Sequence, residues 1–250
     1  MIQYKTEEEI KIMTEGGNIL KKVYQDLKKI VKPNIRTIDI DTETQRLIKL
    51  YGGEISFNKV PGYKWATCIT LNEQVVHTPP SERLVNESDI ITIDMGVYYK
   101  GFHVDYSDTF IVGKTNSDEI DQFLQIGRDT LYKAIDIVTD GVYIGEISSF
   151  IQSEIEGKGY FVMRELTGHG VGHELHEDPL IPGYLEKPIE KTPKLKNGMV
   201  VAIEVIYSMG TTEIEEEEGN NWSIVTKDGS LSACFEHTVA INKNKPFILT

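Results

Sequence analysis

Two neighbouring segments of the chain decide its fold. Residues 90–98 read Ile-Ile-Thr-Ile-Asp-Met-Gly-Val-Tyr, and residues 102–112 read Phe-His-Val-Asp-Tyr-Ser-Asp-Thr-Phe-Ile-Val. Both segments are rich in β-branched and aromatic residues, and a short turn at Tyr99-Lys100-Gly101 separates them. We therefore expect an antiparallel hairpin of two long strands, with Asp94 in the first and Asp105 in the second.

The two aspartates of this hairpin would lie opposite each other if the chain turns at Tyr99 and Lys100. Directly opposed residues of an antiparallel pair share one face of the sheet, with Cβ atoms about 4.5–5.5 Å apart. Two carboxylates there repel each other unless a metal ion or a shared proton neutralises them. A shifted register would instead direct Asp94 and Asp105 to different faces. The hairpin alone leaves both arrangements open.

Two later strand-like segments also contain an acidic residue: Glu204 in residues 199–207, and Glu236 in residues 233–241. An acidic side chain within an apolar strand is unfavourable unless it is paired or bound to a metal. For either glutamate alone, a buried salt bridge is the more frequent arrangement. The four acids together have no matching set of lysines or arginines in strand interiors, so a divalent metal ion is the simpler explanation.

Three histidines are candidates for the same site. His169 lies between glycines, which let the backbone approach a ligand closely, and an imidazole favours a transition metal over Mg²⁺ or Ca²⁺. Alone it would more often be structural, but four carboxylates and one imidazole suit two metals about 3.5–4 Å apart. His77, before Thr78-Pro79-Pro80, and His176, beside acidic residues, are each typical of surface histidines. Next to a metal pair they become candidates for proton transfer or oxyanion stabilisation.

Bulk composition restricts the class of protein. The chain has 250 residues, 40% of them hydrophobic and 26% charged, which fits a soluble globular protein; we expect a single catalytic domain over residues 1–250. The net charge of −13 argues against nucleic-acid specificity or an anionic membrane surface. The two cysteines form no disulfide framework, the start lacks the apolar core of a signal peptide, and no apolar run approaches the roughly 20 residues of a membrane span. We expect a cytoplasmic protein.

Four helices are expected, in two pairs. The first begins with a Thr-x-x-Glu capping box at residues 6–9 and is ended by Pro33; the second covers about residues 39–51. The third begins at Ser117 and runs to about residue 138, and the fourth covers about residues 145–155. The apolar positions of the two pairs correspond, which indicates two related αβ halves, although apolar helices also resemble each other by chance. The acidic residues 213–219 are expected to form a solvated loop tip.

At these residues the sequence resembles the type I methionine aminopeptidases, a family with the pita-bread fold. The resemblance covers nearly the whole chain, and the ordered set Asp, Asp, His, Glu, Glu is highly specific for the fold superfamily. It implies an α+β fold in which two pseudo-symmetric αβ halves surround a curved, mainly antiparallel sheet with the metal site in its centre. No Cys-rich N-terminal extension or long insert of type II enzymes is expected. The matching motifs are residues 93–97, 101–105, 168–172, 176–177, 202–204, 230–233 and 236–238.

The resemblance also implies an activity and a role for each residue. The activity would be removal of the initiator methionine from nascent proteins and peptides with a small second residue. Asp94 would bind one metal through both oxygens, Asp105 and Glu236 would bridge, and His169 and Glu204 would complete the second metal. The metals would be Co, Mn, Fe or Zn, the enzyme would generally be a monomer, and transient ribosome contact would fit the substrate although the charge of −13 offers no basic docking surface.

Substrate contacts follow from the same resemblance. Glu204 would also act as general base, His176 would contact the scissile carbonyl, and His77 would lie near the first peptide bond and help proton transfer. Both histidines would contact the substrate. The pocket for the methionine side chain would be lined by Phe57, Val60, Tyr63, Cys68, Leu175 and Trp222.

Three positions depart from the family pattern. Thr78-Pro79-Pro80 stands where relatives usually have Gly-Ile-Pro, Val205 where many have proline, and Leu175 where an aromatic residue is common. The first and third adjoin the substrate, so the tolerated second residue is not fixed by the resemblance. Two other functions share the five-residue pattern or the fold: an Xaa-Pro aminopeptidase or dipeptidase, and a non-catalytic binding protein.

Overall fold

The computed structural model describes residues 2–114, 117–243 and 245–250. Its α-helices are Glu7–Leu27 (α1), Thr37–Leu50 (α2), Asp118–Asp136 (α3) and Ile144–Glu156 (α4), and 3-10 turns lie at Phe57–Lys59 and Ile189–Lys191. The strands are Glu54–Ile55 (β1), Thr67–Leu71 (β2), Gln74–Val76 (β3), Ile90–Tyr99 (β4), Phe102–Ile111 (β5), Phe161–Val162 (β6), Thr167–Gly170 (β7), Glu177–Pro182 (β8), Val200–Ser208 (β9), Ile214–Glu216 (β10), Ile224–Thr226 (β11), Ser232–Ala240 (β12) and Phe247–Ile248 (β13).

The helix starts follow the capping signals in the sequence. At α1 the Thr6 side chain accepts the Glu9 N–H while the Glu9 carboxylate accepts the Thr6 N–H, so the predicted capping box is present. At α3 the Ser117 side chain accepts the Ile120 N–H, again as predicted. The expected end of α1 was too late. The helix closes at Leu27, ahead of Pro33, because the next residues form a tight turn with i→i−3 bonds such as Ile30 N–H to the Leu27 carbonyl.

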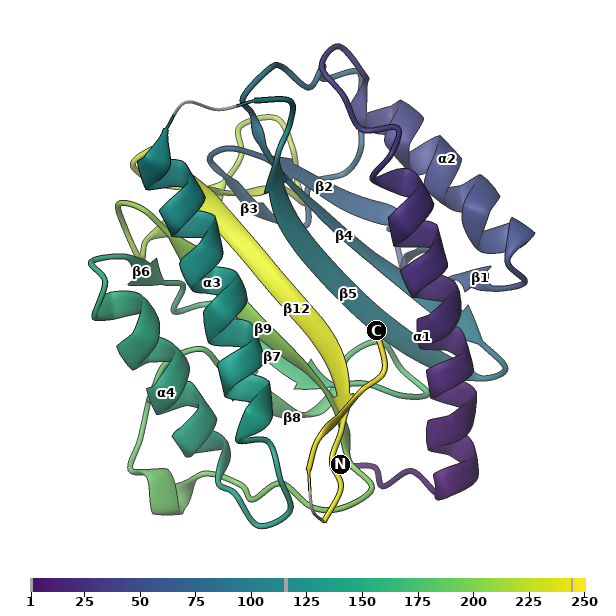
Figure 1. Cartoon of the computed structure of the whole chain (residues 1–250), viewed down its shortest axis with the longest axis vertical. Helices are drawn as coiled ribbons and strands as arrows, with labels where there is room; N and C mark the ends of the chain where they lie inside the picture. Colours follow the sequence, from purple (N-terminus) through teal and green to yellow (C-terminus); the bar gives the residue numbers. More distant parts are fainter. Residues whose placement is uncertain (1, 115–116, 244) are drawn as a thin grey trace.

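One antiparallel sheet forms the centre of the molecule. Its main path runs β1-β4-β5-β12-β9-β7-β8, and β2, β13 and β6 pair with β4, β12 and β9 respectively. A smaller sheet, β10-β11-β3, lies beside it. Figure 1 shows α1 and α2 over one side of the main sheet and α3 and α4 over the other side of the same face. This arrangement confirms the predicted α+β fold with a mainly antiparallel sheet.

The hairpin of β4 and β5 forms where expected, but its register differs from the expectation. Asp94 lies opposite Ser107, and Asp105 lies opposite Gly96. The turn residues are Lys100 and Gly101, both with positive φ (48° and 96°), which is typical of a two-residue hairpin turn. The turn is therefore one residue later than predicted. The register shifts by two positions, and a shift of two keeps both aspartates on the same face.

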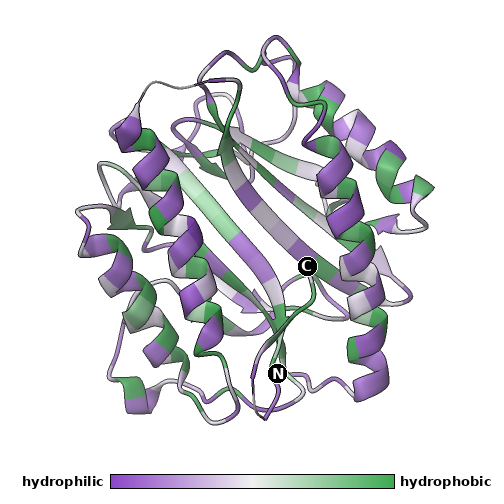
Figure 2. Ribbon diagram, viewed as in Figure 1, coloured by the Kyte–Doolittle hydropathy of each residue, from purple (hydrophilic) through white to green (hydrophobic). Residues whose placement is uncertain are grey.

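Alternation along the strands separates the core from the site. In β4, Ile93, Met95 and Val97 are buried in an apolar cluster with α1 and α2, so Asp94 between them points to the opposite face. In β9, Ile203 and Val205 pack in a second cluster with α3 and α4, so Glu204 points away from those helices. Figure 2 shows hydrophobic and hydrophilic residues side by side on every helix, as expected for helices that cover a sheet with one face.

The two halves use equivalent positions in the same way. Ile40 in α2 and Ile147 in α4 are both fully buried against the sheet. Gly52 and Gly159 follow the two helices with nearly identical positive φ values of 86° and 85°. In each half, the second helix of the pair is thus followed by a glycine in the left-handed conformation. These matches support the predicted pairing of two related αβ halves.

The acidic segment at residues 213–219 is not the loop tip that we expected. Residues Ile214–Glu216 form β10 and pair with β11, which in turn pairs with β3. The glutamate side chains at 215, 216 and 218 are nonetheless exposed. The sequence pattern predicted that this segment is exposed but did not predict the strand. A strand of three residues at a sheet edge is too short to show a periodic pattern. Within the described ranges, no helix has the length and hydrophobicity needed to cross a lipid bilayer.

Candidate active site

Four strands and one glycine-rich segment direct their polar side chains to one place. Asp94 and Asp105 come from β4 and β5, Glu204 and Glu236 from β9 and β12, and His169 from β7. Glu204 and Glu236 are directly paired across the β9–β12 ladder, and His169 pairs with Ala202 on the other edge of β9. The strand order places these side chains on the face of the sheet away from the helices.

All five side chains line one cavity of about 160 Å³. Ligand atoms of Asp105, His169 and Glu236 lie within 4.8 Å of one another, and these three residues are buried. Nε2 of His169 lies 3.4 Å from Oε1 of Glu204. Asp94 shares the cavity wall but stands outside the tightest group of three. The structure thus brings together the five residues that the sequence singled out.

Burial dominates the electrostatics of the four carboxyls. It raises the pKa of Asp94, Glu204 and Glu236 well above the usual range, and repulsion from neighbouring carboxylates, above all Asp105, raises each of them further. For Asp105, burial raises the pKa to about 7, although the Tyr106 N–H donates to its Oδ1 at 3.0 Å and so favours the charged form. Burial thus favours the protonated form of these carboxyls, and a bound cation would favour the charged form.

His169 is held in the neutral form. Burial and the nearby His176 lower the pKa of His169 to about 3, and its Nδ1 lies 2.9 Å from the Gly170 carbonyl oxygen. A proton on Nδ1 donated to that carbonyl leaves the Nε2 lone pair directed toward Glu204 and the cavity. A neutral imidazole fixed by a second hydrogen bond is the form that binds metals.

The donor set fits divalent cations. In the part of the chain that the structure describes, the ion-pair contact recorded for these four carboxyls is the one between Glu204 and the neutral His169, and no lysine or arginine pairs with them. Two of their oxygens, Oδ1 of Asp94 and Oε1 of Glu236, are buried with no hydrogen-bond partner. Buried unpaired carboxylate oxygens are unfavourable, and metal coordination removes that penalty. The chemistry of four oxygen ligands and one nitrogen ligand suits transition-metal ions rather than Mg²⁺ or Ca²⁺ alone.

Two further histidines lie at the opening of the cavity. His77 follows β3 and adopts a left-handed backbone with φ of 59°, and His176 immediately precedes β8. The His176 ring packs edge-on against His169 at 4.5 Å between centroids. Desolvation lowers the pKa of both imidazoles, and repulsion from His176 lowers that of His77 further. Both shifts favour the neutral imidazole, which can accept or donate a hydrogen bond.

An apolar wall closes the other side of the cavity. Phe57, Tyr63, Cys68 and Leu175 form a compact cluster, with Val60 and Trp222 packed against it. The Tyr63 hydroxyl donates to the Thr67 carbonyl at 2.7 Å, which fixes its ring, and the Trp222 ring lies 5.2 Å from the Tyr63 ring. All six predicted wall residues line the same cavity as the acids. The wall suits an uncharged, apolar side chain.

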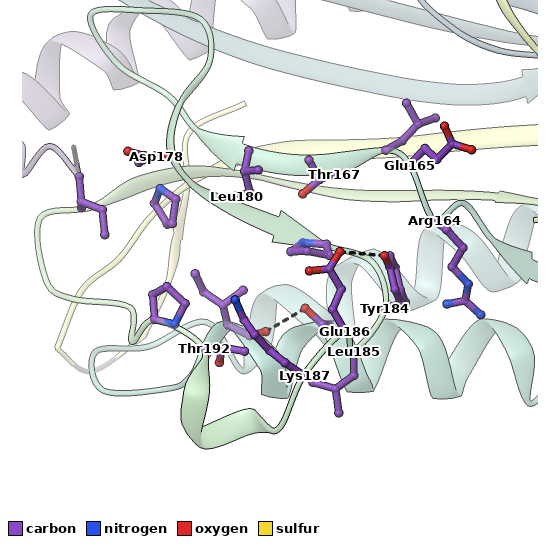
Figure 3. Close-up of a pocket in the computed structure, with 17 residues that line it drawn as sticks. Arg164, Glu165, Thr167, Asp178, Leu180, Tyr184, Leu185, Glu186, Lys187 and Thr192 are labelled. Atoms are coloured by element: carbon purple, nitrogen blue, oxygen red, sulfur yellow. Dashed lines mark hydrogen bonds between the residues drawn. The ribbon is translucent and has the colours of Figure 1, made fainter. Parts of the chain in front are cut away.

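A larger hollow of about 590 Å³ lies elsewhere, between α4 and the segment that follows β8. Figure 3 shows Arg164 and Tyr184 at one end of this hollow and Thr192 and Lys187 at the other. The Tyr184 hydroxyl donates a hydrogen bond to the Glu186 carboxylate. None of the residues predicted for the catalytic site lines this hollow. Size alone therefore does not identify the site; the smaller cavity has the convergent acids and histidines.

Residues 11–243 match the model of metallopeptidase family M24. This chain belongs to metallopeptidase family M24. The chain is accordingly a metal-dependent peptidase.

Similar proteins span the same length as this M24 chain. Methionine aminopeptidase 1 of Bacillus subtilis is 40% identical over 250 residues, which covers 100% of this chain and 99% of the relative. A methionine aminopeptidase of Clostridium acetobutylicum is 38% identical, with 100% and 99% covered. The crystal structure of a methionine aminopeptidase from Thermotoga maritima has a TM-score of 0.95 at 37% identity, with 100% of this chain and 99% of that chain covered.

A more distant structure shows the same fold in a longer protein. The prolidase from Pyrococcus furiosus has a TM-score of 0.77 at 24% identity. This chain matches it over 99% of its own length but over only 65% of the prolidase. The M24 fold is thus shared, while the full-length correspondence is with the methionine aminopeptidases.

Two residues of the cavity were missed by the sequence analysis. Cys234 and Val76 also line it. Cys234 stands two residues before Glu236 in β12, so strand alternation places both on one face, and this signal could have found it. Val76 ends β3 next to His77, and nothing in its local sequence distinguishes it from a core valine.

Proposed function

We propose that this M24 metallopeptidase removes the N-terminal methionine from nascent proteins and peptides with a small second residue. The observation that carries the proposal is the meeting of two surfaces in one cavity: four buried carboxyls with His169 on one side, and an apolar wall on the other. The full-length identity of 40% to a methionine aminopeptidase supports the choice of methionine as the side chain that fills the wall.

We assign Asp94, Asp105, His169, Glu204 and Glu236 as ligands of two divalent metal ions. Asp94 would hold one ion, Asp105 and Glu236 would be shared by both ions, and His169 with Glu204 would complete the other. Bound there, the ions would supply a water of lowered pKa, an anchor for the free amino terminus and polarisation of the scissile carbonyl. The ions are Co, Mn, Fe or Zn, and metal analysis of protein purified without added metal identifies the one that is retained.

The chain's own groups carry the remaining chemistry. Glu204, whose pKa is raised by burial, accepts the proton of the attacking water. His176 donates a hydrogen bond to the scissile carbonyl oxygen as negative charge develops on it. His77, which lines the same cavity, lies against the first peptide bond and helps the proton that Glu204 accepted to reach the leaving amine. The apolar wall of Phe57 to Trp222 holds the methionine side chain and excludes water.

One assay separates this function from its alternatives. Metal-loaded enzyme is incubated with Met-Gly-Ser, with an Xaa-Pro peptide, and without substrate, and released amino acid is measured. We expect free methionine from Met-Gly-Ser only. Cleavage of the proline peptide alone would assign the chain to the prolidase-like members of the fold, and no cleavage with any of the four metals would indicate a binding protein.

The setting of the enzyme follows from the substrate. Nascent chains are available in the cytoplasm, where we place the protein as a monomer in transient contact with ribosomes. Gel filtration tests the monomer, and co-sedimentation with ribosomes at low and physiological salt tests the contact. The net charge of −13 predicts that such contact is weak and confined to a small surface.

A further inference from the structure

A buried ion pair joins the N-terminal segment to the loop that carries His176. Nζ of Lys5 lies 2.5 Å from Oε2 of Glu177, and the two side chains are only 3% and 5% exposed. Lys5 immediately precedes the N-cap of α1, and Glu177 immediately follows His176. Figure 1 shows the N-terminal segment and β8 at the same end of the molecule. Lysine is almost never fully buried unless it is paired, so this contact needs an explanation.

The backbone around the pair is built to admit the lysine. A Cβ on Gly172 would lie 2.3 Å from Cε and 2.6 Å from Nζ of Lys5, so a side chain at residue 172 would displace the end of the lysine. The Lys5 N–H donates to the Gly198 carbonyl at 2.6 Å, which fixes where the side chain starts. Gly172 belongs to the same glycine-rich segment as His169. The end of the Lys5 side chain therefore lies against Gly172, in the segment between His169 and His176.

Glu177 organises the loop from Gly172 to His176. Its Oε1 accepts the Glu174 N–H at 3.2 Å while its Oε2 meets Lys5. The Gly172 N–H donates to the Glu174 carbonyl at 3.0 Å, which closes the loop on itself. This loop supplies Leu175 to the apolar wall and His176 to the opening of the cavity. A displacement of Glu177 would therefore move both.

We propose that Lys5 is a positioning residue: its buried ion pair with Glu177 holds the 172–177 loop so that His176 meets the scissile carbonyl. The role of His176 in this inference rests on the proposed function. The tether, by which we mean the Lys5–Glu177 ion pair and the loop that it holds, does not depend on that function. Loss of the charge on Lys5 leaves the buried Glu177 carboxylate without a cationic partner, and the loop then moves to bring that carboxylate to water. A shift of about 1 Å in a catalytic group lowers the rate by up to roughly 100-fold.

The test compares Lys5→Met with Lys133→Met. Lys133 forms an ion pair with Glu154 at 2.9 Å on the exposed surface of α3 and α4, so it is a matched control without a link to the loop. We expect Lys5→Met to lower kcat on Met-Gly-Ser by about 10- to 100-fold with wild-type metal content, and Lys133→Met to leave both unchanged. Wild-type kcat in Lys5→Met, or an equal loss of bound metal, would overturn the proposal.

A double-mutant cycle with His176→Ala separates positioning from general support of the fold. If Lys5 acts through His176, Lys5→Met has little further effect on kcat once His176 is alanine. Equal fold-losses in both backgrounds would show that Lys5 acts elsewhere. Should Lys5→Met not fold, Glu177→Gln removes the charge on the other partner, leaves Lys5 buried without an anion and keeps an acceptor for the Glu174 N–H; wild-type kcat in that variant would also refute the tether.

Amide hydrogen exchange gives a readout that does not depend on activity. We expect the peptide that covers residues 172–178 to exchange at least several-fold faster in Lys5→Met, with and without metal, and to be unaffected in Lys133→Met. Unchanged exchange would contradict the tether even if kcat fell. If the wild-type enzyme released no methionine, the proposed function would fail, while the exchange experiment would still decide whether Lys5 holds the loop.

Discussion

Glu204 and Glu236 are direct cross-strand partners in the ladder between β9 and β12. Directly opposed side chains in such a ladder stand about 4.5–5.5 Å apart at Cβ, and like charges there are destabilising. Burial, and then repulsion from Asp105, raises the pKa of both carboxyls well above the usual range, and Glu204 raises that of Glu236 further. The fold therefore keeps an unfavourable pair at the centre of its sheet, which is expected where function rather than stability determines the residues.

Removal of one of these charges should stabilise the metal-free protein. We expect Glu236→Gln to raise the free energy of unfolding in the presence of a chelator by about 1–2 kcal/mol, since one pKa unit corresponds to about 1.4 kcal/mol. The same variant should lose the stabilisation that metal gives the wild type. Denaturant unfolding with and without chelator measures both effects. Glu218→Gln, at an exposed position, is the control, and a less stable Glu236→Gln in chelator would contradict the repulsion.

Metal affinity should rise with pH. A carboxyl whose pKa is raised on folding stabilises the folded state below its unfolded pKa, and this contribution is lost as pH rises through the folded value, about 7 for Asp105. Metal must displace those protons, whereas His169, with a pKa of about 3, is already neutral. We expect affinity to increase about tenfold per pH unit between pH 5.5 and 7, one proton released per ion. Calorimetric titration at several pH values tests this, and a flat profile would exclude protonated carboxyls in the metal-free site.

Asp105→Asn should abolish turnover, because the residue assigned to bridge both ions loses its charge. We expect kcat to fall by at least about 100-fold and the content of the second metal to fall with it. Metal analysis and the methionine-release assay on the same preparation provide both values. Asp108→Asn is less suitable as a control because Arg128 and Lys28 pair with that residue. Asp89→Asn, in the turn before β4, is the preferable control. Wild-type turnover in Asp105→Asn would contradict the bridging role of Asp105.

His176→Ala should lower turnover while the metals stay bound. A donor that stabilises a developing oxyanion contributes about 10²- to 10³-fold in kcat, and His176 lies beside the metal-binding group without being part of its tightest cluster. His173→Ala is the matched control, since His173 stands in the same loop but is exposed and packs on Phe102. An equal loss of metal in His176→Ala would instead place this residue among the ligands.

Much of this site could be predicted from the sequence because each acid interrupts an apolar strand. An acid such as Asp94 or Glu204 is visible as an exception in a local pattern, and its cost when buried points to a metal without knowledge of the partners. The hairpin register was harder to predict from the sequence. It depends on which two of Tyr99, Lys100 and Gly101 form the turn, and the turn lies at Lys100 and Gly101, not at Tyr99 and Lys100. The prediction of a shared face nevertheless held, because the error was two residues and not one.

Long-range contacts were beyond the sequence analysis. The pairing of Glu204 with Glu236 requires β12 to lie between β5 and β9, an order that local periodicity does not encode. The contact of Lys5 with Glu177 joins residues far apart in the chain, and Lys5 reads as an ordinary solvated lysine before a helix. Such contacts depend on topology, so the residue types give no sign of them until the strands are placed.

The apolar wall gives the last prediction. Trp222 covers the Tyr63 ring at 5.2 Å and lines the cavity, whereas Trp65 packs on the same ring at 5.1 Å without lining it. We expect Trp222→Ala to raise KM for Met-Gly-Ser roughly tenfold, as loss of apolar contact in a hydrophobic pocket does, with kcat within about threefold of wild type. Trp65→Ala removes a similar area behind the wall and should leave KM unchanged. Steady-state kinetics of the two variants tests this prediction. Equal KM changes would mean that both tryptophans act by stacking on Tyr63 and that Trp222 does not contact the methionine side chain.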